Sequence, residues 1–312
     1  MRWFGSAQKK PGWMCVNLMP DRIDVAHVLI AGRERPEVTL CESYRKDGDN
    51  VSTLKRLARV LELDRYRCTT LLGAGQYQMV QVEAPSVPDA ELKAAVRWRV
   101  KDAIDFSIDK ATLDALKIPA AGASRNQQVF VVAARNDAVA ATVKPFNDAD
   151  VSLEVVDVPE TAQRNLAACI EEAGRALVLL AFDEHGGLLT FSCGGELYQY
   201  RRMDVSRDTL STARSEMRQQ LYERIVLELQ RSLDHFDRQF GQLVVSKVVL
   251  APVAEAPDLQ EYLASNLSVP VVPLDLAQVL ECVHVPELRE AARQQQCLQL
   301  IGAAMRVEGA AA

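Results

Sequence analysis

The chain has 312 residues, of which 48% are hydrophobic and 25% charged, and its formal net charge is −6. These values are typical of an ordinary globular protein with two domains or lobes and a substantial core. The acidic balance argues against a nucleic-acid binder, which would present a basic face. No apolar run approaches the roughly 18 residues that a membrane-spanning helix needs.

Residues 1–13 are polar and aromatic and lack the apolar core of a secretory signal. We expect them to form a flexible leader partly folded onto the body. A second interpretation stays open, because aromatic side chains interleaved with basic ones also suit contact with a membrane surface.

The first folded unit has the pattern of three strands, a helix and a further strand. The strands are expected at Met14–Leu18, Ile23–Ile30 and Val38–Tyr44, the helix at Ser52–Leu63, and the later strands at Arg67–Leu72 and Met79–Val82.

Residues 85–149 have no counterpart later in the chain. The pattern there predicts a helix over Asp89–Asp102, a loop and short strand over Ile104–Leu116, a strand over Val129–Ala134 and a helix from Asn136 to Phe146. We interpret this segment as a small α/β subdomain inserted into the first unit.

The second unit repeats the order of the first. A strand at Leu153–Val156 and a helix at Pro159–Ala173 lead into it. Leu177–Arg202 then reads as three strands separated by turns, followed by a helix over Arg214–Phe240 and a strand over Leu243–Leu250. A helix at Pro257–Leu267, a strand at Val269–Pro273 and a helix at Leu288–Val307 follow.

The repeated order predicts an α/β fold of two ribonuclease-H-like lobes. We assign residues 1–13 to the leader, 14–84 plus 150–173 to the first lobe, 85–149 to the inserted subdomain, 174–308 to the second lobe and 309–312 to a tail.

The seven cysteines are widely spaced and none forms a CxxC pair, which predicts reduced core thiols in a cytosolic protein. The four histidines show no metal-ligand spacing, so we predict no metal site.

Five stretches carry a resemblance to the actin-like pilus-assembly family of PilM, and more closely to its relative MshI of mannose-sensitive haemagglutinin (MSHA) pilus systems. They are residues 15–28, 95–116, 129–166, 227–240 and 294–306. Their order along nearly the whole chain is a stronger signal than any one of them.

The resemblance implies an actin-like fold in the cytoplasm, peripheral to the inner membrane. It also implies docking onto the cytoplasmic tail of an inner-membrane pilus protein, such as PilN or an MshJ-type component. Motor components of the pilus are further candidate partners.

The family's nucleotide site needs glycine-rich turns whose N–H groups approach phosphate, and acids that hold Mg²⁺. The first turn, G-I-D-I-G-S in the family, matches Cys15–Pro20, where Asn17 replaces the acid and both glycines are absent. The second, D-I-G-A, matches Leu180–Asp183, and the adenosine loop, L-S-G-G-G-A, matches Leu250–Ala254, which has no glycine. Three losses together predict that ATP is neither hydrolysed nor bound tightly, so we expect no cofactor and no catalytic residue.

A vestigial cleft is expected around Asn17, Asp157, Asp183 and Arg201. Asp157 matches an acid near the family's metal, but it equally suits a helix start before Pro159. Asp183 lies in either a metal-holding turn or a solvated acidic hairpin. Arg201, beside Arg202, is either a cleft cation or a surface charge at a strand end.

Partner contacts are predicted at Trp98, Arg99 and Phe106, since Trp and Arg dominate binding hot spots. In the family the partner tail lies in a groove between the inserted subdomain and the first lobe. A half-buried amphipathic helix explains these residues equally well.

The leading hypothesis is thus a non-catalytic scaffold, a pseudo-ATPase, of an MSHA-type pilus platform. One alternative is an ATP-binding protein of the same fold that uses Asp157 or Asp183. Another is a metabolite-kinase-like enzyme, which is disfavoured because no Asp general base follows a recognisable phosphate turn.

Overall fold

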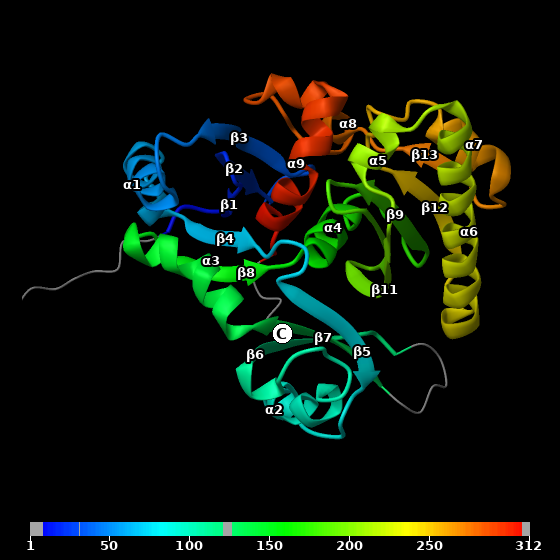
Figure 1. Ribbon diagram of the computed structural model, residues 1–312, viewed down its shortest axis with the longest axis horizontal. Helices are drawn as coiled ribbons and strands as arrows, with labels where there is room; N and C mark the ends of the chain where they lie inside the picture. The colour runs from blue at the N-terminus through cyan, green and yellow to red at the C-terminus, as the bar shows by residue number, and fades with distance from the viewer. Residues whose placement is uncertain (1–8, 31, 121–126, 308–312) are drawn as a thin grey trace, which may run out of the picture.

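Two five-stranded sheets and one three-stranded sheet organise the chain (Figure 1). The computed structural model describes residues 9–30, 32–120 and 127–307. The two larger sheets have the same pattern of an antiparallel meander extended by parallel strands, so the predicted repeat of three strands, helix and strand is present.

The first sheet has the order β3-β2-β1-β4-β8. Its strands are β1 (Trp13–Leu18), β2 (Arg22–Leu29), β3 (Glu37–Arg45), β4 (Arg67–Leu71) and β8 (Leu153–Asp157). One face packs its apolar side chains against α1 (Asn50–Val60) and α3 (Asn136–Asp148), with Phe146 fully buried. The carboxylate of Asp49 caps α1 by accepting from the Ser52 N–H at 2.8 Å, and the short 3-10 helix η1 (Leu63–Arg65) follows α1.

The second sheet has the order β11-β10-β9-β12-β13. Its strands are β9 (Ala176–Phe182), β10 (Gly187–Cys193), β11 (Glu196–Met203), β12 (Val245–Leu250) and β13 (Val271–Pro273). Every residue of β9 and β10 is buried, as expected for central strands covered on both faces. The 26-residue helix α6 (Ser215–Phe240) packs its apolar side on this sheet, where Phe236 stacks on Phe191 at 4.9 Å between ring centroids.

Shorter elements complete the second half of the chain. They are α5 (Arg207–Thr212), α7 (Leu259–Asn266), α8 (Leu276–Val279) and the 3-10 helix η3 (Pro286–Arg289).

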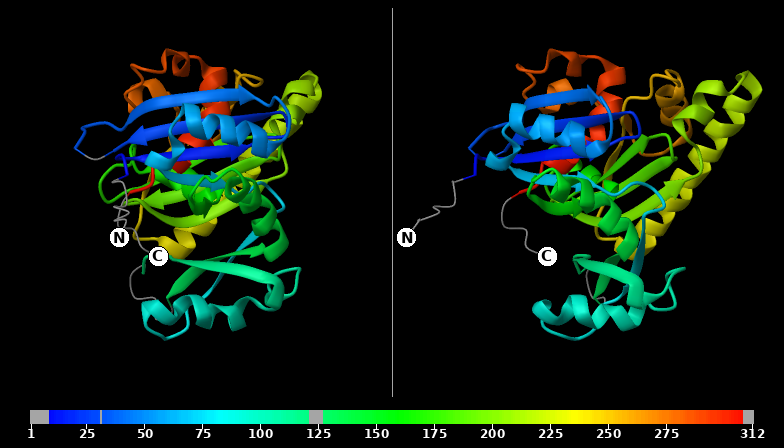
Figure 2. Two further views of the ribbon diagram at one scale, coloured as in Figure 1. Left: turned by 90° about the vertical axis from the view of Figure 1, so that its left-hand side faces the viewer. Right: turned by 60° about the vertical axis from the view of Figure 1, so that its left-hand side comes forward.

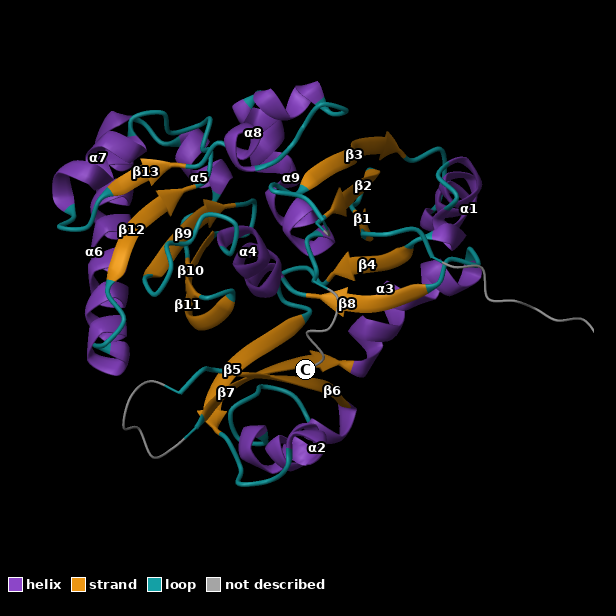
Figure 3. Ribbon diagram, turned by 180° about the vertical axis from the view of Figure 1, so that it is seen from behind, coloured by secondary structure: helices purple, strands orange, loops and turns teal. Residues whose placement is uncertain are grey.

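Of the two helices between the large sheets, the one that is earlier in the chain packs on the second sheet and the later one packs on the first (Figure 3). The helix α4 (Pro159–Ala167) contacts the second sheet, whereas α9 (Ala291–Ala304), near the C-terminus, packs on the first. A division by chain order, with 150–173 in the first lobe and 174–308 in the second, therefore assigns both helices to the wrong sheet. The helices also pack closely on each other, since a Cβ added at Gly302 would lie 2.2 Å from the Ala162 carbonyl oxygen.

The third sheet, of order β5-β7-β6, forms a subdomain at one end of the molecule (Figure 2). It contains β5 (Tyr77–Glu83), β6 (Ala111–Lys117) and β7 (Gln128–Arg135), with α2 (Asp89–Val100) and η2 (Ile108–Lys110). We predicted that residues 79–82 form a strand of the first lobe, but β5 pairs only with β7 and belongs to this third sheet. The subdomain's sheet thus begins before residue 85.

The prediction of a flexible leader over residues 1–13 is wrong for residues 9–13. Trp13 opens β1, and the Lys9 Nζ donates to the carbonyls of Asp64 and Tyr66 at 2.9 and 3.0 Å. Residues 9–13 are therefore part of the fold. The other residues of the predicted leader and of its alternative membrane contact, 1–8, lie outside the described residues.

Candidate functional site

A cavity of about 480 Å³ lies between the two large sheets. Its walls come from the turn after β1, the end of β4, the turn after β9 and one side of α9. Of the four residues predicted for this cleft, Asn17 and Asp183 line the cavity, whereas Asp157 and Arg201 do not.

Polar groups of the turn after β1 contact each other. The Met19 N–H donates to the Arg22 carbonyl at 2.9 Å, and the Asn17 amide nitrogen lies 3.4 Å from the Met19 sulfur. Pro20 has no N–H to offer. The turn therefore offers few N–H groups that could donate a hydrogen bond to an anion.

The turn after β9 is closed by its own acid. The Asp183 Oδ1 accepts from the N–H groups of His185 at 2.7 Å and Gly186 at 3.0 Å. Backbone N–H groups of such a turn are the donors that phosphate would use. Phe182 fills the adjacent wall, since a Cβ added at Gly187 would lie 2.9 Å from its ring. This is the geometry of a capped acidic hairpin.

Asp157 is buried and fully engaged at the start of α4. Its Oδ1 accepts from the Val158 N–H at 2.9 Å and from the Thr161 hydroxyl, and its Oδ2 pairs with Arg306 at 2.5 Å. Arg306 lies just after the end of α9, in a distant part of the sequence. The geometry favours the interpretation of Asp157 as a helix-start acid over that of a metal ligand.

Arg202, not Arg201, is the cation on the cleft side of β11. Successive side chains of a strand point to opposite faces. Arg201 is exposed and pairs with Glu228 of α6 at 3.1 Å, whereas Arg202 lines the cavity. The sequence showed two adjacent arginines but did not distinguish their faces.

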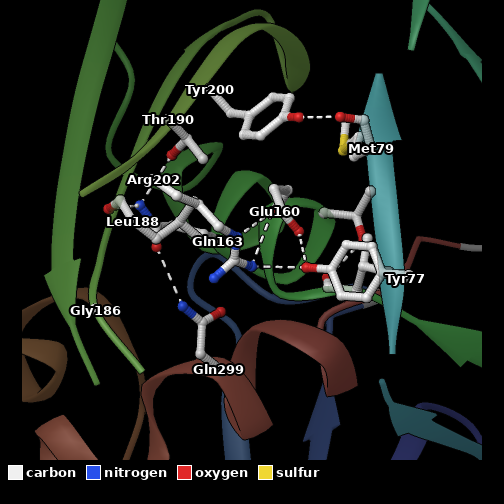
Figure 4. A network of polar contacts seen from close by, with 12 residues as sticks. Tyr77, Met79, Glu160, Gln163, Gly186, Leu188, Thr190, Tyr200, Arg202 and Gln299 are labelled. Carbon is white, nitrogen blue, oxygen red and sulfur yellow. Dashed lines mark hydrogen bonds and ion pairs between the residues drawn. The ribbon is translucent and has the colours of Figure 1, made fainter. Parts of the chain in front are cut away.

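Arg202 belongs to a polar network that sequence reasoning missed, in which Glu160 and Tyr77 are buried and Arg202 is partly exposed (Figure 4). It pairs with Glu160 of α4 at 2.8 Å and donates to the Tyr77 hydroxyl at 2.7 Å, while that hydroxyl donates to Glu160 at 2.5 Å. Burial, together with the Glu160 charge, raises the pKa of Tyr77. The network joins α4, β5 and β11 from three parts of the chain, so no local pattern signals it.

Tyr200 adds a second link between the subdomain and the second sheet. Its hydroxyl donates to the Met79 carbonyl of β5 (Figure 4). Its ring meets the Phe130 ring edge-on, with 5.6 Å between the ring centroids. Deeper in, the Gln163 amide donates to the carbonyls of Leu179 and Leu188 at 2.6 and 3.1 Å.

A second hollow, of about 590 Å³, lies beside this network. It is bounded by β5, the segment 102–105 after α2, and β11. β5 and β11 are the edge strands of their sheets. The carboxylates of Asp102 and Asp105 line it and make no ion pair with any described residue.

The predicted partner-contact residues do not line this hollow. Trp98 and Arg99 are exposed on α2, where the Trp98 side chain is 78% accessible. Phe106 is half-buried and packs against the core of the subdomain. Phe106 therefore differs from Trp98 and Arg99 in burial, because it packs within the subdomain whereas they are exposed to solvent.

Within residues 9–30, 32–120 and 127–307, no helix is long and apolar enough to cross a membrane. In the same ranges, no group of three or more His, Cys, Asp or Glu side chains is arranged to hold a metal ion.

A family model described as type IV pilus assembly protein PilM matches residues 36–180, just under half of the chain. No curated protein matches the chain by sequence.

Three of the solved structures that match the chain differ in their degree of similarity to it. The first is a PilM–PilN type IV pilus biogenesis complex, with TM-score 0.73 and 18% identity over 95% of this chain and 98% of that chain. The second is a Bacteroides thetaiotaomicron protein with an actin-like ATPase fold, with TM-score 0.51 and 8% identity over 94% and 99% of the two chains. The third is the cytoplasmic domain of EpsL, an inner-membrane component of the Vibrio cholerae type II secretion system, with TM-score 0.47, 12% identity and 95% coverage of both chains, a similarity too low to support an inference.

These similarities confirm the predicted actin-like fold and the resemblance to PilM, while the closer likeness to MshI stays a prediction. The chain is therefore similar to PilM: residues 36–180 match the family model of the type IV pilus assembly protein of that name, and the described residues have the actin-like fold.

Proposed function

We propose that this chain is a non-catalytic cytoplasmic scaffold of an MSHA-type pilus assembly platform. It binds the cytoplasmic tail of an inner-membrane protein similar to PilN or an MshJ-type component. One observation carries the non-catalytic assignment: side chains of the protein itself occupy the groups with which an actin-like cleft binds phosphate and metal. The Asp183 carboxylate accepts hydrogen bonds from two N–H groups of its own turn, and the Asp157 carboxylate forms an ion pair with Arg306.

The energetics oppose nucleotide binding at these positions. A phosphate at the second turn must displace the Asp183 carboxylate from two N–H groups, and each hydrogen bond to a charged group contributes about 1.5–3 kcal/mol. The displaced carboxylate would then lie beside a like charge. A Mg²⁺ ion would have to compete with Arg306 for Asp157, and Asn17 supplies no charge where the family has an acid.

The hollow between β5 and β11 supports the proposal of a tail-binding site. An extended peptide binds well beside an unpaired strand edge, and two sheets present such edges here. Cytoplasmic segments next to membrane helices are rich in Lys and Arg. The unpaired carboxylates of Asp102 and Asp105 therefore suit the charge of such a tail. Because ordering a disordered tail costs about 2–5 kcal/mol, we expect an affinity near micromolar.

Two titrations by calorimetry test the proposal. The first uses Mg-ATP, and micromolar binding there would favour the alternative of a nucleotide-binding protein with an altered site. The second uses a synthetic peptide of the cytoplasmic residues of a PilN-like or MshJ-type protein from the same organism. If the peptide does not bind the folded protein, the scaffold loses its mechanism.

Variants locate the peptide. We expect the double variant Asp102→Asn/Asp105→Asn to weaken peptide binding about tenfold, because exposed ion pairs contribute up to about 1 kcal/mol each. The matched control is Asp109→Asn, an exposed acid of the same subdomain outside the hollow. Equal effects of the two variants would place the tail elsewhere.

A further inference from the structure

The outer face of α2 presents the most exposed large apolar side chain of the described residues. Trp98 is 78% accessible, although indole is the largest side chain in proteins. It projects from a folded helix, because Leu92, Val96 and Val100 on the opposite face are buried in the subdomain core. The Arg97 guanidinium fixes the helix further by donating to the Ile108 carbonyl at 2.6 Å.

The charge of this helix is opposite to that of the whole chain. Residues 93–101 contain four basic side chains and no acidic one, in a protein of net charge −6. Lys93 pairs with Asp114, and Arg97 is held by Ile108. Arg99 and Lys101 are exposed and make no ion pair or side-chain hydrogen bond with any described residue.

The nearby acids lie in other places. Asp102 and Asp105 follow α2 and line the hollow beside β11. Glu91 shares the outer face of α2 but stands about two helical turns before Trp98. The C-terminal half of the helix therefore combines an exposed indole with two unpaired cations.

We propose that this face of α2, with Trp98, Arg99 and Lys101, contacts an anionic lipid surface. Indole rings favour the boundary between headgroups and acyl chains, and Lys or Arg beside them is attracted to anionic headgroups. α2 lies at the extreme end of the molecule, beyond the three-stranded sheet (Figures 1 and 2). A flat surface can thus reach it without meeting either large lobe.

This contact goes beyond the proposed function, because it needs no partner protein. It would place the neighbouring hollow next to the membrane from which a tail emerges. Each cation near an anionic surface strengthens binding about fivefold, so two contribute about 25-fold.

The test is flotation of the full chain, without partner, on vesicles of phosphatidylcholine alone and with about one-third phosphatidylglycerol. We expect binding to the anionic vesicles only, weakened by salt. Arg99→Glu/Lys101→Glu should lower it at least 25-fold, as estimated above, and Trp98→Ala should lower it as well. The matched control is Lys55→Glu/Arg59→Glu, which reverses two exposed cations on α1 that make no ion pair with any described residue. This control should bind like the wild type, and circular dichroism verifies the fold of each variant.

Several results would overturn the lipid contact. These are absent binding to anionic vesicles, equal losses in the two charge-reversal variants, or no effect of Trp98→Ala. A dimer that depends on Trp98 in size-exclusion chromatography would assign the face to a second copy instead. None of these results bears on peptide binding in the hollow, so the two proposals fail independently.

Discussion

Replacing Gly302 by alanine tests whether the crossing of α4 and α9 is as close as the structure indicates. Gly302 lies inside α9, and the Asn165 side chain of α4 donates to its carbonyl at 3.0 Å. A Cβ at this position would lie 2.2 Å from the Ala162 carbonyl oxygen and 2.7 Å from the carbonyl carbon. These are backbone atoms, so no side-chain rotation relieves the clash.

Two effects of opposite sign decide the outcome. In an exposed helix interior, alanine is favoured over glycine by about 1 kcal/mol. Here the helices must move apart by about 1 Å to restore normal contact, and overpacking of this kind costs about 1–3 kcal/mol or more. The movement also loosens the buried side chains of Leu166 and Ile301, which lie in the same apolar cluster. We therefore expect Gly302→Ala to destabilise the fold by about 2 kcal/mol.

The assay is urea unfolding followed by circular dichroism, with the midpoint compared between variants. Ala292→Ser, on the exposed side of the same helix, is the control and should shift stability by less than about 0.5 kcal/mol. A Gly302→Ala protein as stable as the wild type, or more stable, would refute the close crossing. Helix propensity alone would then govern the position.

Two further predictions concern buried polar groups. Arg202→Gln leaves the fully buried Glu160 without its counter-ion and should lower the free energy of unfolding by about 3 kcal/mol. Arg201→Gln breaks only the pair with Glu228, in which Arg201 is exposed, and should lower it by less than about 1 kcal/mol. Equal midpoints of the two variants in urea unfolding would contradict the assignment of Arg202 to the cleft. Burial lowers the pKa of His27 below its ordinary 6.5, so the folded state binds this proton more weakly than the unfolded chain. Stability should be complete above about pH 6.5 and fall as the pH drops toward the folded-state pKa. His27→Gln should flatten that decline between about pH 7.5 and 5.5, and an unchanged pH profile would exclude His27 as its source.

The sequence alone determined the α/β class and most elements of both lobes. Central strands such as β9 and β10 are recognisable because continuous apolar runs bury both faces of a strand. The absence of glycine at the positions that match the family's two phosphate turns and its adenosine loop was also visible directly, because a close approach of a ligand to the backbone needs a residue without a side chain.

Only the tertiary structure decided which groups meet. Arg306 reaches Asp157 across 149 residues, and Glu160 meets Tyr77 and Arg202 from separate elements. Strand alternation says that Arg201 and Arg202 face opposite ways, but it does not say which faces the cleft. Likewise, the pattern of α9 predicts a helix, while its place on the first sheet depends on how the chain crosses between lobes. Local periodicity records the conformation of a segment, whereas its partner is set by contacts that no local spacing encodes.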